Sequence, residues 1–526
     1  MRLIIPALVC LAVLPLTAAN LYEQLSDSTA VVKEPVPSRF RFSYEVIPLS
    51  DTEEMGTVGT HFEWHPFQSF EPFYAGFGFY SAARGDEGGF FTFGYTVGLD
   101  YKLYDRLHAD AGIYFGGGGG GHLTFPGGGM IVRTHAALSY ALRLEGVSFS
   151  LGLARTDFPN TENEEYKRDL HPFAGININD AVWRKTSDAN RSRNAVDFDG
   201  LFRDIRITPA FVMYDVDDKP TKRAIFYSDD NAYQDDFPMI GIQFDRFVTD
   251  AFFVSMEGYG AVGSAAGYAA VQVGLGYDLK LADMLVWESK MVGGFAGDGR
   301  IDTGGGFIVQ PMTGLRLQMT PSLSFKTLAG RTYAPQGLFS ATTYEAGLTW
   351  QASRPVPKKG SYLFCSESFE NLEWVMSPSY KAYFPFGSDH KKSKDASEQE
   401  ITLIGITLSA PLSSWFSLMG STYWAMTGNT GSYAEGLFGA KLSTPAFTPL
   451  NISANVRGEI GAGAGAGINT SSGGYVTETL AGLELPLSEH TALDLEGGRM
   501  QTSDGKFKAD TLLLSLNINL NFTYKK

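Results

Sequence analysis

The feature that most constrains this chain is a strict two-residue alternation of apolar and polar side chains over long segments. Between Phe91 and Leu103 every odd position is apolar, while the even positions hold Thr, Gly, Asp and Lys. The segment from Leu512 to Tyr524 alternates in a similar way, with Leu513 and then Ser, Asn and Thr on its second face. A period of two indicates β-strands with one apolar and one polar face.

The length of these segments separates two kinds of all-β protein. Strands of soluble sandwiches usually have about five or six residues and bury their apolar face against a second sheet. Several segments here reach about ten residues, the length with which a tilted strand crosses a bilayer. In lipid, strands can span only as a closed barrel, because every backbone amide must be paired. We therefore expect a transmembrane antiparallel β-barrel, with a soluble repeat sandwich as the alternative.

Aromatic side chains gather near the ends of several segments, where they would form interfacial girdles of a membrane barrel. Ordinary core packing is the alternative. The groups are Phe62 and Trp64 with Phe67, Phe70 and Phe73, then Trp415 with Phe416, and Tyr423 with Trp424.

The chain also repeats itself three times, with a period of about 150 residues that suits a small barrel. In each copy a strand motif precedes a glycine tract and then a second glycine motif. The three sets are Val97–Leu103, Gly116–Gly121 and Gly127–Ile131; Val273–Leu279, Gly293–Gly299 and Gly304–Ile308; and Gly436–Leu442, Gly461–Gly467 and Gly473–Val476. We interpret the tracts as sites of bends, bulges or close approach; hairpins that constrict the lumen are the alternative.

Each copy divides into about eight strands, which gives about 24 in all. In the first copy we expect strands near 39–47, 57–65, 73–82, 90–103, 107–117, 129–142, 147–156 and 172–180. The predicted organisation is a signal peptide at 1–19, a periplasmic tail at 20–37, barrel repeats at 38–181, 203–351 and 372–526, and linkers at 182–202 and 352–371. The even strand count places the long charged loops, such as 215–236 and 388–400, outside the cell.

The start of the chain predicts export. Met1 and Arg2 precede an apolar run that ends in small residues up to Ala19, as in a secretory signal peptide. Cys10 lies in that peptide, so only Cys365 is left in the mature chain and no internal disulfide can form. A formal charge of −15 without a basic stripe argues against a nucleic-acid partner.

No catalytic or cofactor-binding residue emerges from the sequence, and the expectation is no cofactor. Eight histidines are scattered singly, at positions 61, 65, 108, 122, 135, 171, 390 and 490, and none lies beside a serine as a nucleophile would lie beside its base. A metal site stays open: acidic groups at 215–218, 229–230, 235–236, 298 and 302 have the oxygen ligands that Ca²⁺ prefers. Solvated loop charge is the commoner explanation.

In these features the chain resembles bacterial outer-membrane β-barrels, and each copy is similar in size and strand count to eight-stranded barrels of the OmpA/OmpX type. The strand that ends in Phe522 and Tyr524 looks like their terminal recognition strand, although Lys525 and Lys526 extend beyond it. The resemblance implies a Gram-negative outer membrane, contact with its lipid and lipopolysaccharide, and insertion by the barrel-insertion machinery through the C-terminal strand.

Two further expectations concern architecture and role. The junctions near 181–201 and 351–370 are much longer than the turns within a copy, and Thr92, Gly94 and Thr96 suit a narrow lumen. We therefore expect three separate eight-stranded barrels in preference to one ring of 24 strands. For function, a structural or surface-interaction role is the first hypothesis, a passive pore or transport channel the second, and a lipid-modifying enzyme the third.

Overall fold

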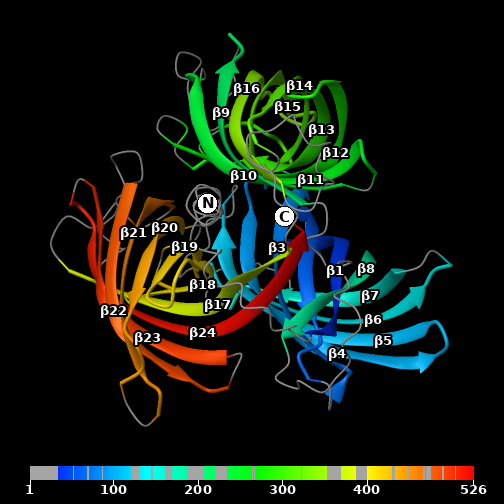
Figure 1. The fold of residues 1–526 in the computed structure, drawn as a ribbon. Coiled ribbons are helices and arrows are strands. Elements are labelled where there is room, and N and C mark those ends of the chain that lie inside the picture. Colours follow the sequence, from blue (N-terminus) through cyan, green and yellow to red (C-terminus); the bar gives the residue numbers. More distant parts are fainter. Residues whose placement is uncertain are drawn as a thin grey trace.

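The computed structural model contains three closed antiparallel barrels of eight strands each, arranged around a common centre (Figure 1). The all-β class and the three separate barrels are thus confirmed. The structure describes residues 33–525 apart from 51–52, 68–69, 86, 121–128, 144–145, 160–168, 186–204, 219–233, 248, 263–264, 266, 298, 300, 321–322, 352–368, 387–399, 429, 431–432, 448–449, 466–467, 469–474, 489–490 and 504.

The first barrel closes by pairing its first strand with its eighth, Lys33 opposite Lys185 through Glu45 opposite Phe173. Its strands are β1 (Lys33–Pro48), β2 (Glu54–Trp64), β3 (Phe73–Arg84), β4 (Phe91–Tyr104), β5 (Leu107–Gly119), β6 (Ile131–Ala141), β7 (Val147–Asp157) and β8 (His171–Lys185). β1 thus begins within the segment expected as a tail, and β8 ends within the segment expected as a linker.

The second barrel closes by pairing β16 with β9, Ala341 opposite Val216 through Gln351 opposite Arg206. Its strands are β9 (Ile205–Val216), β10 (Phe237–Phe247), β11 (Phe252–Ala261), β12 (Ala269–Ala282), β13 (Leu285–Gly297), β14 (Phe307–Gln318), β15 (Leu323–Tyr333) and β16 (Ser340–Gln351).

The third barrel closes by pairing β17 with β24, Phe369 opposite Lys525 through Pro385 opposite Ala509. Its strands are β17 (Phe369–Pro385), β18 (Ile401–Pro411), β19 (Phe416–Ala425), β20 (Ala434–Ser443), β21 (Ser453–Ala464), β22 (Tyr475–Pro486), β23 (Thr491–Thr502) and β24 (Lys508–Lys525). β17 begins inside the segment expected as the second linker.

Every barrel has a short-turn end and a long-loop end. The short-turn end carries the tight connections, such as those from Tyr104 to Leu107 and from Ala282 to Leu285. The long-loop end carries the glycine-rich segments that follow β5, β13 and β21. The described part of the chain contains no helix of the length and apolar character needed to cross a membrane.

The two faces that the alternation predicts are separated in β4. Leu99, Tyr101 and Leu103 are exposed on the outer wall, whereas Thr92 and Thr96 are buried on the lumen side. Phe91 and Phe93, on the same outward face as Leu99, are nevertheless buried. The apolar face of β4 therefore changes its surroundings along the strand, because near the long-loop end the outer walls of the three barrels pack against one another.

Candidate functional site

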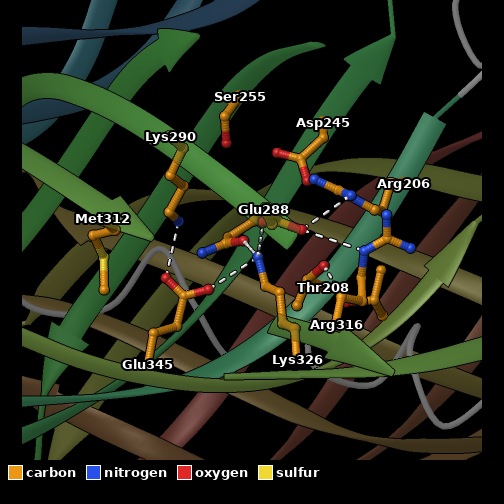
Figure 2. Close-up of polar contacts among 12 residues, drawn as sticks. Arg206, Thr208, Asp245, Ser255, Glu288, Lys290, Met312, Arg316, Lys326 and Glu345 are labelled. Carbon is orange, nitrogen blue, oxygen red and sulfur yellow. Dashed lines mark hydrogen bonds and ion pairs between the residues drawn. The ribbon is translucent and has the colours of Figure 1, made fainter. Parts of the chain in front are cut away.

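The lumen of the second barrel holds a network of buried ion pairs centred on Glu288 (Figure 2). Its carboxylate lies 3.1 Å from Arg206 Nη1, 3.3 Å from Arg316 Nε and 3.1 Å from Lys326 Nζ. Arg206 also pairs with Asp245 at 2.7 Å. Three cations around one carboxylate, each fully desolvated, hold strands from across the barrel together.

The network continues toward the long-loop end through Glu345. Its two oxygens lie 2.9 Å from Lys326 Nζ and 2.9 Å from Lys290 Nζ (Figure 2). Lys290 also reaches Glu257 at 2.5 Å. Because these side chains come from β11, β13, β15 and β16, the ion pairs cross the lumen and fill its interior. A barrel of eight strands has room only for packed side chains.

The first barrel has an equivalent network built on two neighbouring arginines of β1. Arg39 and Arg41 each place a guanidinium nitrogen 2.6 Å from Asp110 Oδ2. Arg39 also contacts Glu63. Nearer the long-loop end of the same lumen, Arg133 pairs with Glu45 at 2.8 Å.

The third barrel uses Lys381, Arg457 and Lys441 as its lumen cations. Lys381 Nζ lies 3.0 Å from Glu435 and 2.7 Å from Glu478. Its ammonium group also lies 3.6 Å from the centre of the Tyr423 ring, a cation–π contact.

Apolar clusters close each lumen at the long-loop end, above the ion pairs. In the second barrel Tyr214, Phe237, Tyr268 and Phe339 pack with ring centres 5.3–6.2 Å apart. The equivalent clusters in the other barrels include Tyr80, Phe90, Tyr114 and Phe158, and Tyr383, Tyr433, Ile468 and Phe507. Since several of these side chains come from the connecting loops, the loops themselves plug the barrels.

The outer walls of the three barrels meet in an apolar cluster that we call the central seam. Its buried members are Phe91, Phe93, Ala269, Met376, Ile404, Ile406, Trp424 and Ala434. The second and third barrels also meet nearer the short-turn end, in a cluster that contains Ile207, Ile242, Trp374 and Leu412.

One polar side chain crosses the central seam from the first barrel into the wall of the third. The Tyr95 hydroxyl donates a hydrogen bond to the carbonyl oxygen of Gly405 and accepts one from Ser379 N at 3.0 Å. Ser379 and Gly405 are register partners of β17 and β18. The tyrosine therefore satisfies backbone groups of a sheet to which it does not belong.

The glycine tracts lie at these contacts between barrels. Gly117 packs against the third barrel, where a Cβ on it would stand 2.5 Å from the carbonyl oxygen of Ala425. Gly88 N donates a hydrogen bond of 3.1 Å to Gly304 O, and Met130 N donates one of 3.1 Å to Met426 O. Gly88 and Gly117 thus serve close backbone approach between barrels. Gly116–Gly119 do not constrict the lumen, since they continue β5 in the barrel wall.

The aromatic groups predicted as girdles separate into different environments. Phe67, Phe70 and Trp415 are exposed near the short-turn end, as the prediction requires. Trp424 lies in the central seam, and Tyr423 faces the lumen of the third barrel. The girdle interpretation was wrong for this pair, because period-two alternation does not show whether an apolar face meets lipid, a neighbouring barrel or a lumen plug.

The histidines show no catalytic arrangement within the described residues. His61 lies between the rings of Tyr80 and Tyr114, and His135 Nε2 lies 2.7 Å from Asp110. The others serve as local contacts: His65 with the Glu71 carbonyl, His108 with Asp100 and His171 beside Glu45. No hydrogen bond joins a serine to any of these five histidines, while positions 122, 390 and 490 lie outside the described residues.

The acidic groups suggested for Ca²⁺ serve the loops in which they lie. Asp217 pairs with Arg331 at 2.7 Å, Asp236 accepts from Val216 N at 2.9 Å, and Asp302 accepts from Gly304 N at 2.9 Å. Among the residues that the structure describes, no three His, Cys, Asp or Glu side chains gather closely enough to hold a metal ion. Positions 229, 230 and 298, like Cys10, Cys365 and the predicted signal peptide, lie outside the described residues.

The ion-pair networks are the site features that the sequence analysis missed. Their signal was present in the alternation: charged residues occupy mid-strand positions of one face, as with Glu288 and Lys290 in β13 or Arg457 and Glu459 in β21. A mid-strand charge in a membrane strand must point into the lumen. Which charges meet across the lumen depends on strand tilt and register, which alternation does not encode.

Comparison with known proteins yields remote matches among solved structures. No family model and no curated protein matches the chain. Among solved structures, OpdQ of Pseudomonas aeruginosa covers 93% of this chain and 98% of its own at 9% identity and a TM-score of 0.20. OpdK of the same organism, solved with vanillate, covers 92% and 98% at 8% identity and a TM-score of 0.22. The siderophore receptor PirA of Acinetobacter baumannii covers 93% and 81% at 9% identity and a TM-score of 0.27. Likeness at these scores carries no argument about function, and the resemblance to OmpA/OmpX-type barrels stays a prediction.

Proposed function

We propose that this chain is an integral outer-membrane β-barrel protein of a Gram-negative bacterium. The observation that carries the proposal is its inverted distribution of side chains. Charged residues are buried in the lumens, while large apolar residues such as Leu151, Leu275, Met291 and Leu483 are exposed on the outer walls. Exposed apolar surface on this scale suits a lipid environment, and closed sheets leave no unpaired edge there.

Within that setting we favour a structural or surface-interaction role. Each lumen is filled by ion pairs nearer the short-turn end and by an apolar cluster at the long-loop end. The solvent-facing groups of the long-loop end then remain as the surface available to partners. Outer-membrane lipid and lipopolysaccharide would contact the walls, and the insertion machinery would engage β24.

A transport channel is the second candidate, and a specific observation favours it. Ionisable side chains of the third barrel continue to the short-turn end, where the Glu484 side chain is 31% exposed and lies 3.1 Å from Lys441. Among the described residues, the cluster that closes the opposite end includes side chains from loops, such as Tyr433, Ile468 and Phe507. A displaced loop would therefore open a polar path. For a lipid-modifying enzyme, the described residues offer no comparable support.

Conductance across planar lipid bilayers tests the choice. We expect the purified full-length protein, folded and heat-modifiable on gels, to insert without producing stable unitary currents, because the lumens are occluded. A reproducible open-channel current at low voltage would reject the structural role in favour of the channel. Protein that is fully soluble without detergent would reject membrane insertion itself.

A further inference from the structure

The lumen of the third barrel contains more negative charge than its cations can balance. Its buried cations are Lys381, Lys441 and Arg457, and its buried carboxylates are Glu435, Glu459, Glu478, Asp494 and Glu496. Among the described residues, three cations thus face five carboxylates, whereas four cations face five carboxylates in the second barrel. Two negative charges of the third lumen have no counter-charge.

Two of the three cations are committed to particular carboxylates. Lys441 Nζ lies 2.6 Å from Asp494 near the short-turn end of the lumen. Lys381 lies between Glu435 and one oxygen of Glu478, at 3.0 and 2.7 Å. The surplus must therefore lie among the four carboxylates that surround Lys381 and the remaining cation.

That cation is Arg457, which three carboxylates share. Its Nη2 lies 3.2 Å from Glu459 and 3.8 Å from Glu478, and its Nε lies 3.3 Å from Glu496. Glu478 Oε1 and Glu496 Oε1 are buried and have no hydrogen-bond partner among the described residues.

The other two carboxylates near Arg457 and Lys381 are Glu435 and Glu459, and each accepts hydrogen bonds from hydroxyl groups. Glu435 accepts hydrogen bonds from the hydroxyls of Tyr383 and Tyr433, at 2.6 and 2.7 Å. Glu459 accepts one from Ser421 Oγ at 2.6 Å and lies 3.2 Å from Arg457 Nη2, although its Oε2 also has no hydrogen-bond partner among the described residues. Hydrogen-bond donors stabilise an ionised carboxylate, so the groups that remain to be neutralised are Glu478 and Glu496.

We propose that Glu478 and Glu496 form a proton-binding site, each carboxylate taking one proton on its unpartnered oxygen. A buried carboxylate without a counter-charge is costly, and in a protein it neutralises instead. Two protons drawn from the aqueous phase balance the two surplus charges. The site exists whether the lumen stays closed or conducts.

The surroundings of the pair come from every strand of the barrel. The titratable and charged groups are Lys381 and Tyr383 from β17, Tyr423 from β19, Glu435 and Lys441 from β20, Arg457 and Glu459 from β21, Glu484 from β22, and Asp494 from β23. β18 and β24 contribute the neutral side chains of Thr407, Ser409, Ser515 and Asn517.

Protons reach the pair from the short-turn end. Glu484 is part-exposed there and contacts Lys441, which in turn contacts Asp494 next to Glu496 in β23. At the long-loop end the apolar cluster with Tyr433, Ile468 and Phe507 blocks water. The site is thus coupled to the pH on one side of the membrane only.

Infrared spectroscopy of the full-length protein in detergent tests the proposal, because a protonated carboxyl has a carboxylic-acid C=O stretch that an ionised carboxylate lacks. At neutral pH we expect this band in the wild type. Glu478→Gln and Glu496→Gln should each remove part of it, and the double variant should remove both contributions. The matched control is Asp510→Asn in β24, an exposed carboxylate of the same barrel that is paired with Arg499 outside the lumen, and it should leave the band unchanged.

Two results would overturn the proposal. One is a wild-type band at neutral pH that is equal in Glu478→Gln, Glu496→Gln and the control, since the protons would then reside elsewhere. The other is carboxylate bands of these two residues that shift when sodium replaces potassium in the buffer, since a bound metal cation would then balance the charge. Each single variant carries the test if the double variant does not fold.

Discussion

Tyr95 shows how one side chain can add a polar contact between two barrels whose outer walls meet mainly through apolar side chains. Apolar side chains pack against lipid about as well as against another apolar wall, so the central seam gains specificity from its polar contact. The hydroxyl satisfies Ser379 N and Gly405 O within the wall of the third barrel. Removing the hydroxyl leaves both backbone groups without this partner in an apolar setting.

We therefore expect Tyr95→Phe to reduce the free energy of unfolding by roughly 1–3 kcal/mol, the cost of a buried polar group that loses its partner. The measurement is the temperature at which the folded, fast-migrating form disappears on SDS gels. Tyr101→Phe is the matched control, since Tyr101 lies on the same face of β4 but is 61% exposed. Equal midpoints for the two variants would show that the hydroxyl of Tyr95 does not stabilise the seam.

At the scale of elements, the strands were largely predictable and their surroundings were not. The expected strands at 73–82 and 147–156 correspond to β3 and β7 within a few residues, because alternation and turn residues are local signals. The seam could not be predicted, since Phe93 on the seam and Leu99 on the outer wall follow the same alternation. The lumen pair of Arg39 and Asp110 joins strands far apart in the chain, so its geometry depends on the closed barrel.

The glycine tract at the end of β5 gives an element-scale prediction. Gly117→Ala places a Cβ against the carbonyls of Ala425 and Trp424, so β5 must move away from β19. We expect a loss of roughly 1–3 kcal/mol in the free energy of unfolding, as for other overpacked contacts. Gly458→Ala in β21 is the control, because a Cβ there meets nothing within 4 Å. Urea unfolding followed by tryptophan fluorescence measures both, and a Gly117→Ala midpoint at or above the control value would contradict the close-approach interpretation.

At the scale of the whole molecule, the outer walls are apolar and the lumens are charged. One substitution on an outer wall distinguishes a membrane barrel from a soluble protein. Leu275 lies in the middle of β12 and is 65% exposed on the outer wall of the second barrel. In a soluble protein, arginine at such a position would leave stability nearly unchanged, as most surface substitutions do. In a membrane barrel, arginine at the bilayer midplane costs about 2–4 kcal/mol, and the cost falls to about 0–1 kcal/mol near the interface.

Leu281, one residue from the end of β12 and also exposed, provides the matched position near the short-turn end. We expect Leu275→Arg to lower the yield of folded, heat-modifiable protein in lipid vesicles and its free energy of unfolding, whereas Leu281→Arg should resemble the wild type. If the two variants behaved alike, the outer wall of the second barrel would not be facing lipid, and the inverted distribution of side chains would need another partner to cover it.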